Sequence, residues 1–281
     1  MNKKLAIVGI FYDGYYDIWE DFLDLIDKYW EDNPYPIYIV NNEKEIKFKK
    51  EYDVNVIHAG ADAEYSKKVQ KALKEIDADY FLLLLEDFFV SKKINNKCIL
   101  NILRKVEEDN LKYYRMTIPD FLTKKELKNP IGEIDSSAEY TLSCQPSIWK
   151  KEFLKKCIGN ENYNAWIFEG IYSKSKQAHT SEFLNGCMYD YTNPLELRHG
   201  YVQGSMLPTV YNYFISEGYV FKAKRKIMTK KNFLIYKLKT ILKSYVPVEI
   251  QNTIKKRFRT NSVIGKYDSE INQYMNLMDI K

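Results

Sequence analysis

The stretch Tyr80-Phe81-Leu82-Leu83-Leu84-Leu85, followed directly by Glu86-Asp87, decides the fold class. A short, unbroken apolar run is typical of a parallel strand that is buried on both faces, because helices cover both sides of such a sheet. The run ends in two carboxylates at the point where the strand would leave the core. The stretch therefore predicts a central strand of an α/β sheet with acidic side chains at its carboxyl end.

Shorter apolar runs on both sides of this strand alternate with amphipathic segments. The further predicted strands are 5–11, 36–40, 54–57, 113–117, 140–149 and 183–191. The predicted helices are 18–30, 65–76, 96–108, 151–157, 164–176 and 208–217. This alternation predicts an α/β fold with a mostly parallel, mixed sheet that is flanked by helices and joined by right-handed crossovers.

The charge of the chain, +5 in total, is unevenly distributed. Residues 222–260 contain 13 Lys and Arg but only one acid, Glu249, so the remainder of the chain is acidic. We therefore expect one α/β domain with a ligand site over 1–221 and a basic amphipathic helical tail over 222–281. A basic tail on an acidic body predicts binding to an anionic surface, either lipid or nucleic acid.

Residues 233–246 of the tail predict an amphipathic helix that lies in the plane of a membrane. At about 100° per residue, one face of this helix gathers Leu234, Leu238, Ile241, Leu242 and Tyr245. Pro247 ends the helix, and 255–259 adds a second basic cluster. The alternative is a solvated helix that packs on the domain.

The cysteines and the apolar runs bear on the compartment. The four cysteines have neither CxxC nor metal-ligand spacing, which indicates reduced thiols and a cytoplasmic protein. The first apolar run ends in Tyr12-Asp13-Gly14 without a small-residue cleavage site, so it predicts a strand and not a signal peptide. No apolar run reaches the ~18 residues that a transmembrane helix needs. We expect a cytoplasmic protein that is peripherally attached to the inner face of the membrane.

Polar residues follow four of the predicted strands. They are Tyr12-Asp13, Asn41-Asn42, His58 to Asp62, and Glu86-Asp87. Open α/β sheets bind ligands beyond the carboxyl ends of their strands, so these tips predict one common ligand site. Polar turns without a ligand are the alternative. At the last tip, a carboxylate can hold a divalent cation, Mn²⁺ or Mg²⁺, whereas the plainer alternative is an acid that caps a helix or pairs with a lysine.

Several ordered segments carry a resemblance to a known family. They are Phe11-Tyr12-Asp13-Gly14-Tyr15, 35–42, Tyr65-Ser66, Leu84-Leu85-Glu86-Asp87-Phe88, 145–150 and 166–169. In these segments the chain resembles bacterial GT-A glycosyltransferases of capsule and lipopolysaccharide biosynthesis, over about residues 5–220. The family's Asp-any-Asp motif is incomplete here because Phe88 stands two positions after Glu86. The tail lies outside the resemblance.

The resemblance implies roles for individual residues. The implied set that binds the nucleoside-diphosphate sugar is Tyr12, Asp13, Asn41, Asp62, Gln145, Trp149 and Arg198. Within it, Trp149 would stack on the sugar, and its alternative is a core tryptophan. The implied metal ligands are Glu86, Asp87 and His199. A hydrogen-bonded loop histidine is the alternative for His199.

Glu169 is the candidate general base, with Asp87 as the second catalytic residue. It follows the apolar cluster Trp166-Ile167-Phe168, and apolar neighbours raise the pKa of a carboxyl group toward the range useful for proton transfer. Inverting transfer of a sugar to a hydroxyl group needs one such base and no covalent nucleophile. The alternative is an ordinary surface glutamate.

These patterns favour one function and leave two others open. The leading hypothesis is an inverting transferase that moves a sugar from a nucleoside diphosphate to a hydroxyl of a glycan or lipid-linked acceptor, in bacterial surface polysaccharide synthesis. A nucleotidyltransferase and a non-catalytic nucleic-acid-binding protein are the alternatives, but nucleic acid is not expected as a partner because the basic residues are confined to the tail. The motifs GxxxxGK[ST], GxGxxG and GxSxG are missing, which argues against kinases, dinucleotide dehydrogenases and α/β-hydrolases.

Overall fold

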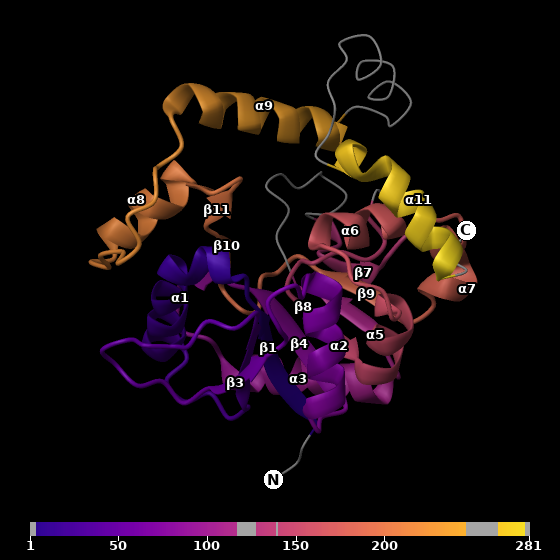
Figure 1. The fold of residues 1–281 in the computed structure, drawn as a ribbon, viewed down its shortest axis with the longest axis horizontal. Helices are drawn as coiled ribbons and strands as arrows, with labels where there is room; N and C mark the ends of the chain where they lie inside the picture. Colours follow the sequence, from indigo (N-terminus) through magenta and orange to yellow (C-terminus); the bar gives the residue numbers. More distant parts are fainter. Residues whose placement is uncertain (1–3, 117–127, 139, 246–263, 279–281) are drawn as a thin grey trace.

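The computed structural model describes residues 4–116, 128–138, 140–245 and 264–278. It is an α/β structure built on an eight-stranded mixed sheet with the strand order β3-β2-β1-β4-β8-β6-β9-β7, flanked by helices on both faces (Figure 1). The predicted fold class is thus confirmed and is consistent with a GT-A-like fold. Of the predicted tail, Val246, Pro247 and the cluster 255–259 lie outside the described residues.

The first half of the sheet is parallel. Its strands are β1 (Leu5–Ile10), β2 (Ile37–Asn41), β3 (Asn55–His58) and β4 (Tyr80–Leu85). All three pairings among these strands, β1 with β2, β1 with β4 and β2 with β3, are parallel, so the four carboxyl ends lie at one edge. The helices of this half are α1 (Tyr16–Tyr29), α2 (Tyr65–Glu75) and α3 (Asn96–Glu108).

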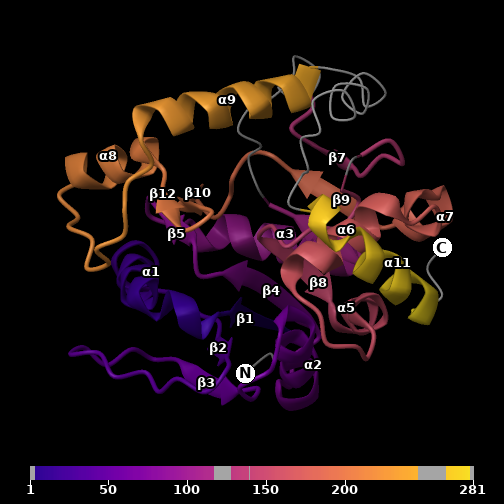
Figure 2. The ribbon, with the colours of Figure 1, turned by 45° about the horizontal axis from the view of Figure 1, so that its top comes forward.

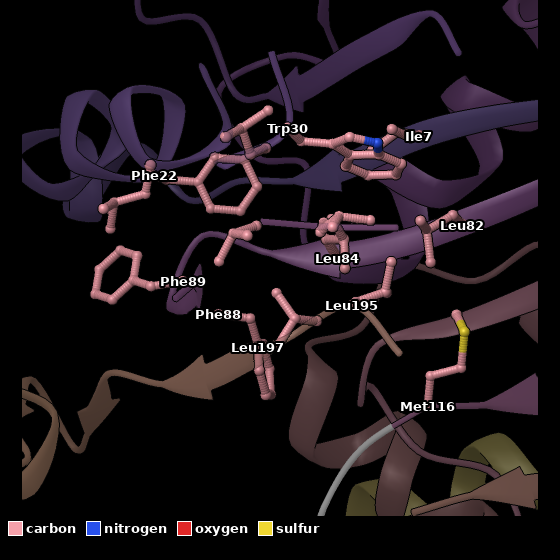
Figure 3. Close-up of a cluster of buried hydrophobic side chains, with 14 of the residues drawn as sticks. Ile7, Phe22, Trp30, Leu82, Leu84, Phe88, Phe89, Met116, Leu195 and Leu197 are labelled. Atoms are coloured by element: carbon pink, nitrogen blue, oxygen red, sulfur yellow. The ribbon is translucent and has the colours of Figure 1, made fainter. Parts of the chain in front are cut away.

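The unbroken apolar run of β4 serves two separate hydrophobic clusters. Leu82 and Leu84 belong to the cluster under α1 and α3, and Phe81 and Leu83 belong to the cluster under α2. Successive side chains of a strand point to opposite faces, so a strand between two cores must be apolar at every position. Figure 3 shows Leu82 and Leu84 in the first cluster, among side chains that α1, β5 and β10 also supply.

The second half of the sheet mixes directions. Its strands are β6 (Tyr113–Arg115), β7 (Ile131–Glu133), β8 (Ser147–Lys150) and β9 (Cys187–Asp190). β8 runs antiparallel to both β4 and β6, β9 runs parallel to β6, and β7 closes the edge antiparallel to β9. The predicted strand 140–149 therefore begins only at Ser147, and the predicted strand 183–191 is a short helix followed by β9.

The remaining elements surround this sheet. The helices are α5 (Lys151–Ile158), α6 (Ala165–Lys174), α7 (Ser181–Leu184), α8 (Pro208–Ser216), α9 (Lys230–Tyr245) and α11 (Asp268–Leu277). Two small antiparallel pairs join β5 (Phe88–Val90) to β10 (Leu197–His199) and β11 (Tyr201–Val202) to β12 (Ser205–Met206). None of the described helices is both long and apolar enough to cross a bilayer.

The segment before α9 is bonded to α1. Buried Asp21 of α1 accepts hydrogen bonds from the Tyr219 hydroxyl and from the backbone N–H groups of Lys222 and Ala223 at 2.8, 2.8 and 3.0 Å. Arg225 forms a two-pronged ion pair with Asp17, also on α1. The first cations of the basic tail are therefore paired with acidic side chains of α1.

The helix after α9 returns to the body of the protein. Ile271 of α11 is fully buried in the cluster that α6 also lines. Lys174 of α6 pairs with Asp268 at 2.6 Å, and the rings of Tyr163 and Tyr274 lie 5.1 Å apart. Between these two attachments, α9 spans one end of the molecule (Figures 1 and 2). Residues 222–281 thus contain both core and peripheral parts.

Candidate active site

Asp13 organises the loop that follows β2. Its carboxylate accepts hydrogen bonds from the backbone N–H groups of Asn42, Glu43 and Lys44 at 3.1, 2.9 and 2.8 Å, and from Asn41 Nδ2 at 2.9 Å. Burial alone raises the pKa of Asp13, but these hydrogen bonds to the ionised form outweigh it and hold the pKa below its ordinary value. Asp13 is therefore a structural anion that joins the ends of β1 and β2.

Asn41 connects the same loop to β3. Its Nδ2 also donates to the carbonyl oxygen of Lys44 at 2.9 Å, and its Oδ1 lies 2.9 Å from Nδ1 of His58. The amide of Asn42 donates to three carbonyl oxygens of the loop after β3, while its own buried Oδ1 has no partner among the described residues. The tips of β1, β2 and β3 are thus brought together, with Asn41 occupied in holding them.

Glu86 is a buried carboxyl group at the end of β4. It is 7% exposed, and the Tyr12 backbone N–H donates to its Oε1 at 3.2 Å. Burial, and after it the charge of Asp87, raises the pKa of Glu86 to about 8. Burial therefore favours the protonated form of Glu86 in the folded protein.

A buried lysine of α2 lies beside this carboxyl group. Burial lowers the pKa of Lys68, and the charges of Glu86, Asp13 and Glu64 partly offset that effect. The Nζ of Lys68 lies 5.4 Å from the centre of the Tyr12 ring, which is 57% exposed. An exposed aromatic ring beside a cation suits the base and the phosphates of a nucleotide.

Asp87 faces the small antiparallel pair of β5 and β10. Its Oδ2 lies 3.1 Å from Nε2 of His199 on β10, and its backbone carbonyl accepts from Gly200 N–H at 2.7 Å. The imidazole of His199 stacks on Phe88 with the ring centres 4.8 Å apart. The other carboxylate oxygen of Asp87, Oδ1, is buried and has no partner among the described residues.

The predicted metal ligands Glu86, Asp87 and His199 do not surround a single point. Among the described residues, no three His, Cys, Asp or Glu side chains are grouped as metal ligands would be. In the two-residue turn between β4 and β5, Glu86 is directed to Tyr12 and Asp87 to His199. Asp87 Oδ1 alone of this set fits a cation. Because Mg²⁺ is often held by one or two carboxylates plus substrate phosphates, this oxygen suits a cation shared with a diphosphate.

Arg198 lies on the opposite side of β10 from His199. Its guanidinium carbon is 3.7 Å from the centre of the Tyr213 ring on α8, and its buried Nε has no partner among the described residues. The side chain is therefore packed on α8. Its contact with a pyrophosphate stays a prediction.

Glu169 and Asp87 both lie near one buried thiol. The backbone N–H of Cys144 donates to Glu169 Oε1 at 3.0 Å. Burial raises the pKa of the Cys144 thiol, and the charges of Glu169 and Asp87 raise it further. The structure thus brings Glu169 of α6 and Asp87, in the turn after β4, close enough to Cys144 for both charges to act on its thiol, although 82 positions separate the two acids in the sequence.

Trp149 does not floor a sugar site. It is 1% exposed, its Nε1 donates to Ser147 Oγ at 2.8 Å, and it packs on Tyr113 and Phe168. The alternative of a core tryptophan is correct, because the ring has no free face for a pyranose. Gln145 is half-buried just before β8. Its contact with the nucleotide sugar stays a prediction.

Asp62 lies at the rim of the site. It is exposed in the loop between β3 and α2, and its carbonyl oxygen accepts from Asn162 Nδ2 at 2.9 Å. This loop lines a shallow surface hollow together with Lys67 and Lys71 of α2. The role of Asp62 in donor binding stays a prediction.

Comparison with known proteins gives structural likeness only. No protein-family model matches the chain, and no curated protein is significantly similar to it in sequence. Similar solved structures include S. aureus TarS (15% identity, TM-score 0.42, 66% of this chain and 35% of that one). S. aureus TarS 1–349 in complex with UDP is also similar, with 14% identity and a TM-score of 0.42 over 67% of this chain and 58% of that one. The bifunctional IspDF from Campylobacter jejuni has 12% identity and a TM-score of 0.31 over 57% of this chain and 44% of that one. The chain thus spans less than two thirds of these structures.

Two residues of the site were missed in the sequence. Lys68 is one of four lysines on α2, and only the orientation of the helix on the sheet decides that it is the buried one. Trp166 is 43% exposed on α6, one turn before Glu169, whereas the other three tryptophans are buried. The helical spacing of Trp166 and Glu169 was visible in the sequence, but their exposure was not.

Proposed function

We propose that this protein is a glycosyltransferase that moves a sugar from a nucleoside diphosphate to a hydroxyl group of a glycan or lipid-linked acceptor. The observation that carries the proposal is that Glu169, bonded to Cys144 N–H, and Asp87, which follows β4 at the carboxyl ends of the parallel strands, both lie near the Cys144 thiol. The quoted resemblance supports the narrower assignment to bacterial surface polysaccharide synthesis.

The donor would lie along the tips of β1 and β4. The exposed ring of Tyr12 offers a face for the base, and Lys68 beside it offers a positive charge for the diphosphate. The loop fixed by Asp13 closes the other side of this corner. A divalent cation, where one is bound, would be held by Asp87 Oδ1 and would offset the charge of the departing diphosphate.

Glu169 would act as the base of the transfer. Its carboxylate takes the proton of the acceptor hydroxyl while that oxygen forms a bond to the anomeric carbon. The bond between this carbon and the diphosphate oxygen breaks with its electron pair, so the anomeric configuration inverts. The hydrogen bond from Cys144 N–H holds Oε1 of this carboxylate in place.

The test combines donor binding with turnover. Purified protein is screened by thermal shift against UDP, GDP, CMP and dTDP species with Mn²⁺ or Mg²⁺, and diphosphate release from the matching sugar nucleotides is then measured. Glu169→Gln should keep the thermal shift while kcat falls by ~10²–10⁴, the usual contribution of a positioned base. Glu182→Gln, at an exposed position of α7, is the matched control. A Glu169→Gln enzyme with more than a tenth of wild-type kcat would move the role elsewhere, and no shift with any nucleotide would contradict donor binding.

A further inference from the structure

Helix α9 has two unlike sides. Phe233 and Tyr236 face inward, where they pack against the first hydrophobic cluster. On the opposite side, Leu234, Ile235 and Leu238 are 59%, 41% and 51% exposed. We call these three residues the outer face. These three aliphatic side chains therefore point away from the protein, the reverse of an ordinary surface helix.

Lysines surround the outer face. They are Lys230, Lys231, Lys237 and Lys239, all exposed. None of them forms a salt bridge with a described residue, in contrast to Lys222 and Arg225, which are paired with acids of α1. Residues 222–240 contain no Asp or Glu. The charge around the outer face is thus positive without an internal counter-charge.

The protein cannot easily hide this face by moving α9. The chain before α9 is fixed to α1 through Asp21, and the chain after it returns to α6 through α11. Because the attachment before α9 uses buried Asp21, and because Phe233 and Tyr236 pack on the first hydrophobic cluster, the first half of α9 is held with its inner side on the protein. Some partner must cover the outer face if it is to leave water.

We propose that the outer face of α9 docks on a membrane that contains anionic phospholipids. Leu234, Ile235 and Leu238 enter the boundary between headgroups and acyl chains, and the lysines beside them meet the lipid phosphates. A second copy of the chain is a poorer occupant, because two such faces would bring their lysines together. Nucleic acid would meet the lysines but would leave the aliphatic side chains in water.

Docking in this way also orients the candidate active site. α9 lies across the end of the molecule toward which β1 and β4 run, so their carboxyl ends are on the membrane side (Figures 1 and 2). In this orientation the site would have access to a lipid-linked acceptor, and that step of the inference rests on the proposed function. The docking of α9 on the membrane does not depend on the proposed function.

Sedimentation with vesicles tests the proposal on the full chain. Vesicles of phosphatidylcholine alone are compared with vesicles containing about one-third phosphatidylglycerol, at about 0.1 M and 1 M salt. Wild type should sediment with the anionic vesicles, and less so at high salt. Leu234→Ser with Leu238→Ser should weaken the partition coefficient at least ~10-fold, and Lys237→Gln with Lys239→Gln about 25-fold.

Matched substitutions elsewhere provide the controls. Leu100→Ser removes a leucine of α3 that is 41% exposed, and Lys155→Gln with Lys156→Gln removes two exposed lysines from α5. Both variants should sediment as wild type does. Equal sedimentation of wild type with both kinds of vesicle would overturn the proposal. Outer-face variants that bind the vesicles as wild type does would also overturn it. So would a dimer of the wild type that the leucine variant alone dissociates, because the outer face would then be an interface between two copies. Hydrolysis of the donor is unaffected in each case, which keeps this test separate from that of the proposed function.

Discussion

Replacing Glu86 with glutamine should change how the stability of the protein depends on pH. The ordinary pKa of the carboxyl group, 4.5, holds in the unfolded chain, whereas burial and Asp87 raise it to about 8 in the folded protein. Between these values the unfolded chain has lost the proton and the folded protein has kept it. Stability from this group is therefore complete below pH 4.5 and is lost as the pH rises through 8.

The expected size follows from the two pKa values. At 1.36 kcal/mol per pKa unit, Glu86 should lower the free energy of unfolding by about 4 kcal/mol between pH 5 and pH 8.5. Glu86→Gln keeps the oxygen that accepts from Tyr12 N–H but carries no titrating proton. Between pH 5 and pH 8.5, the free energy of unfolding of the variant should therefore fall by about 4 kcal/mol less than that of the wild type.

Urea unfolding of both proteins at several pH values measures the effect. The difference between the free energies of unfolding of wild type and Glu86→Gln cancels the other titrating groups. Glu152→Gln, at an exposed position of α5, serves as a control and should show no such trend. A difference between wild type and Glu86→Gln that stays constant within about 1 kcal/mol from pH 5 to pH 8.5 would refute the reasoning.

Three further substitutions probe other parts of the structure. Asp87→Asn should fold normally, as judged by its melting temperature, but lose nearly all donor turnover; wild-type activity unchanged by EDTA would show that no cation is needed. Lys68→Met keeps the buried aliphatic stem and should weaken the binding of a nucleoside diphosphate about 10- to 100-fold by calorimetry, because a charge-assisted hydrogen bond is lost; an unchanged affinity would remove Lys68 from the donor site. Asp21→Asn should destabilise the protein by about 2–3 kcal/mol in urea unfolding, since a buried acceptor of three hydrogen bonds is weakened, and a loss below about 0.5 kcal/mol would mean that the segment 219–223 contributes little.

The sheet could be predicted because its evidence is local. A run such as that of β4 has to be apolar at every position when two cores contact it, and Leu82 and Leu83 do serve different cores. The same logic located the strand tips, where polar residues begin as the chain leaves the core. Helix boundaries agreed closely where the apolar spacing was regular, as in α3.

The details of the site could not be predicted because they depend on contacts between distant segments. Glu86 and Asp87 look alike in the sequence, yet one is turned to Tyr12 and the other to His199, 112 positions away. Trp149 resembled a sugar platform, but its neighbours Tyr113 and Phe168 come from other elements. The burial of α11 likewise depends on α6 and not on any pattern within the basic tail.

The docking of α11 on α6 also determines when the protein can finish folding during synthesis. Lys174 and Asp268 touch across 94 positions of sequence. At roughly 5–20 residues per second, a ribosome takes about 5–20 s to pass from one to the other. In that interval the apolar side of α6 that Ile271 later covers has no native cover, while β1 to β4 are already complete. The half of the protein that carries Glu169 is therefore the half whose core stays incomplete longest while the chain is being made.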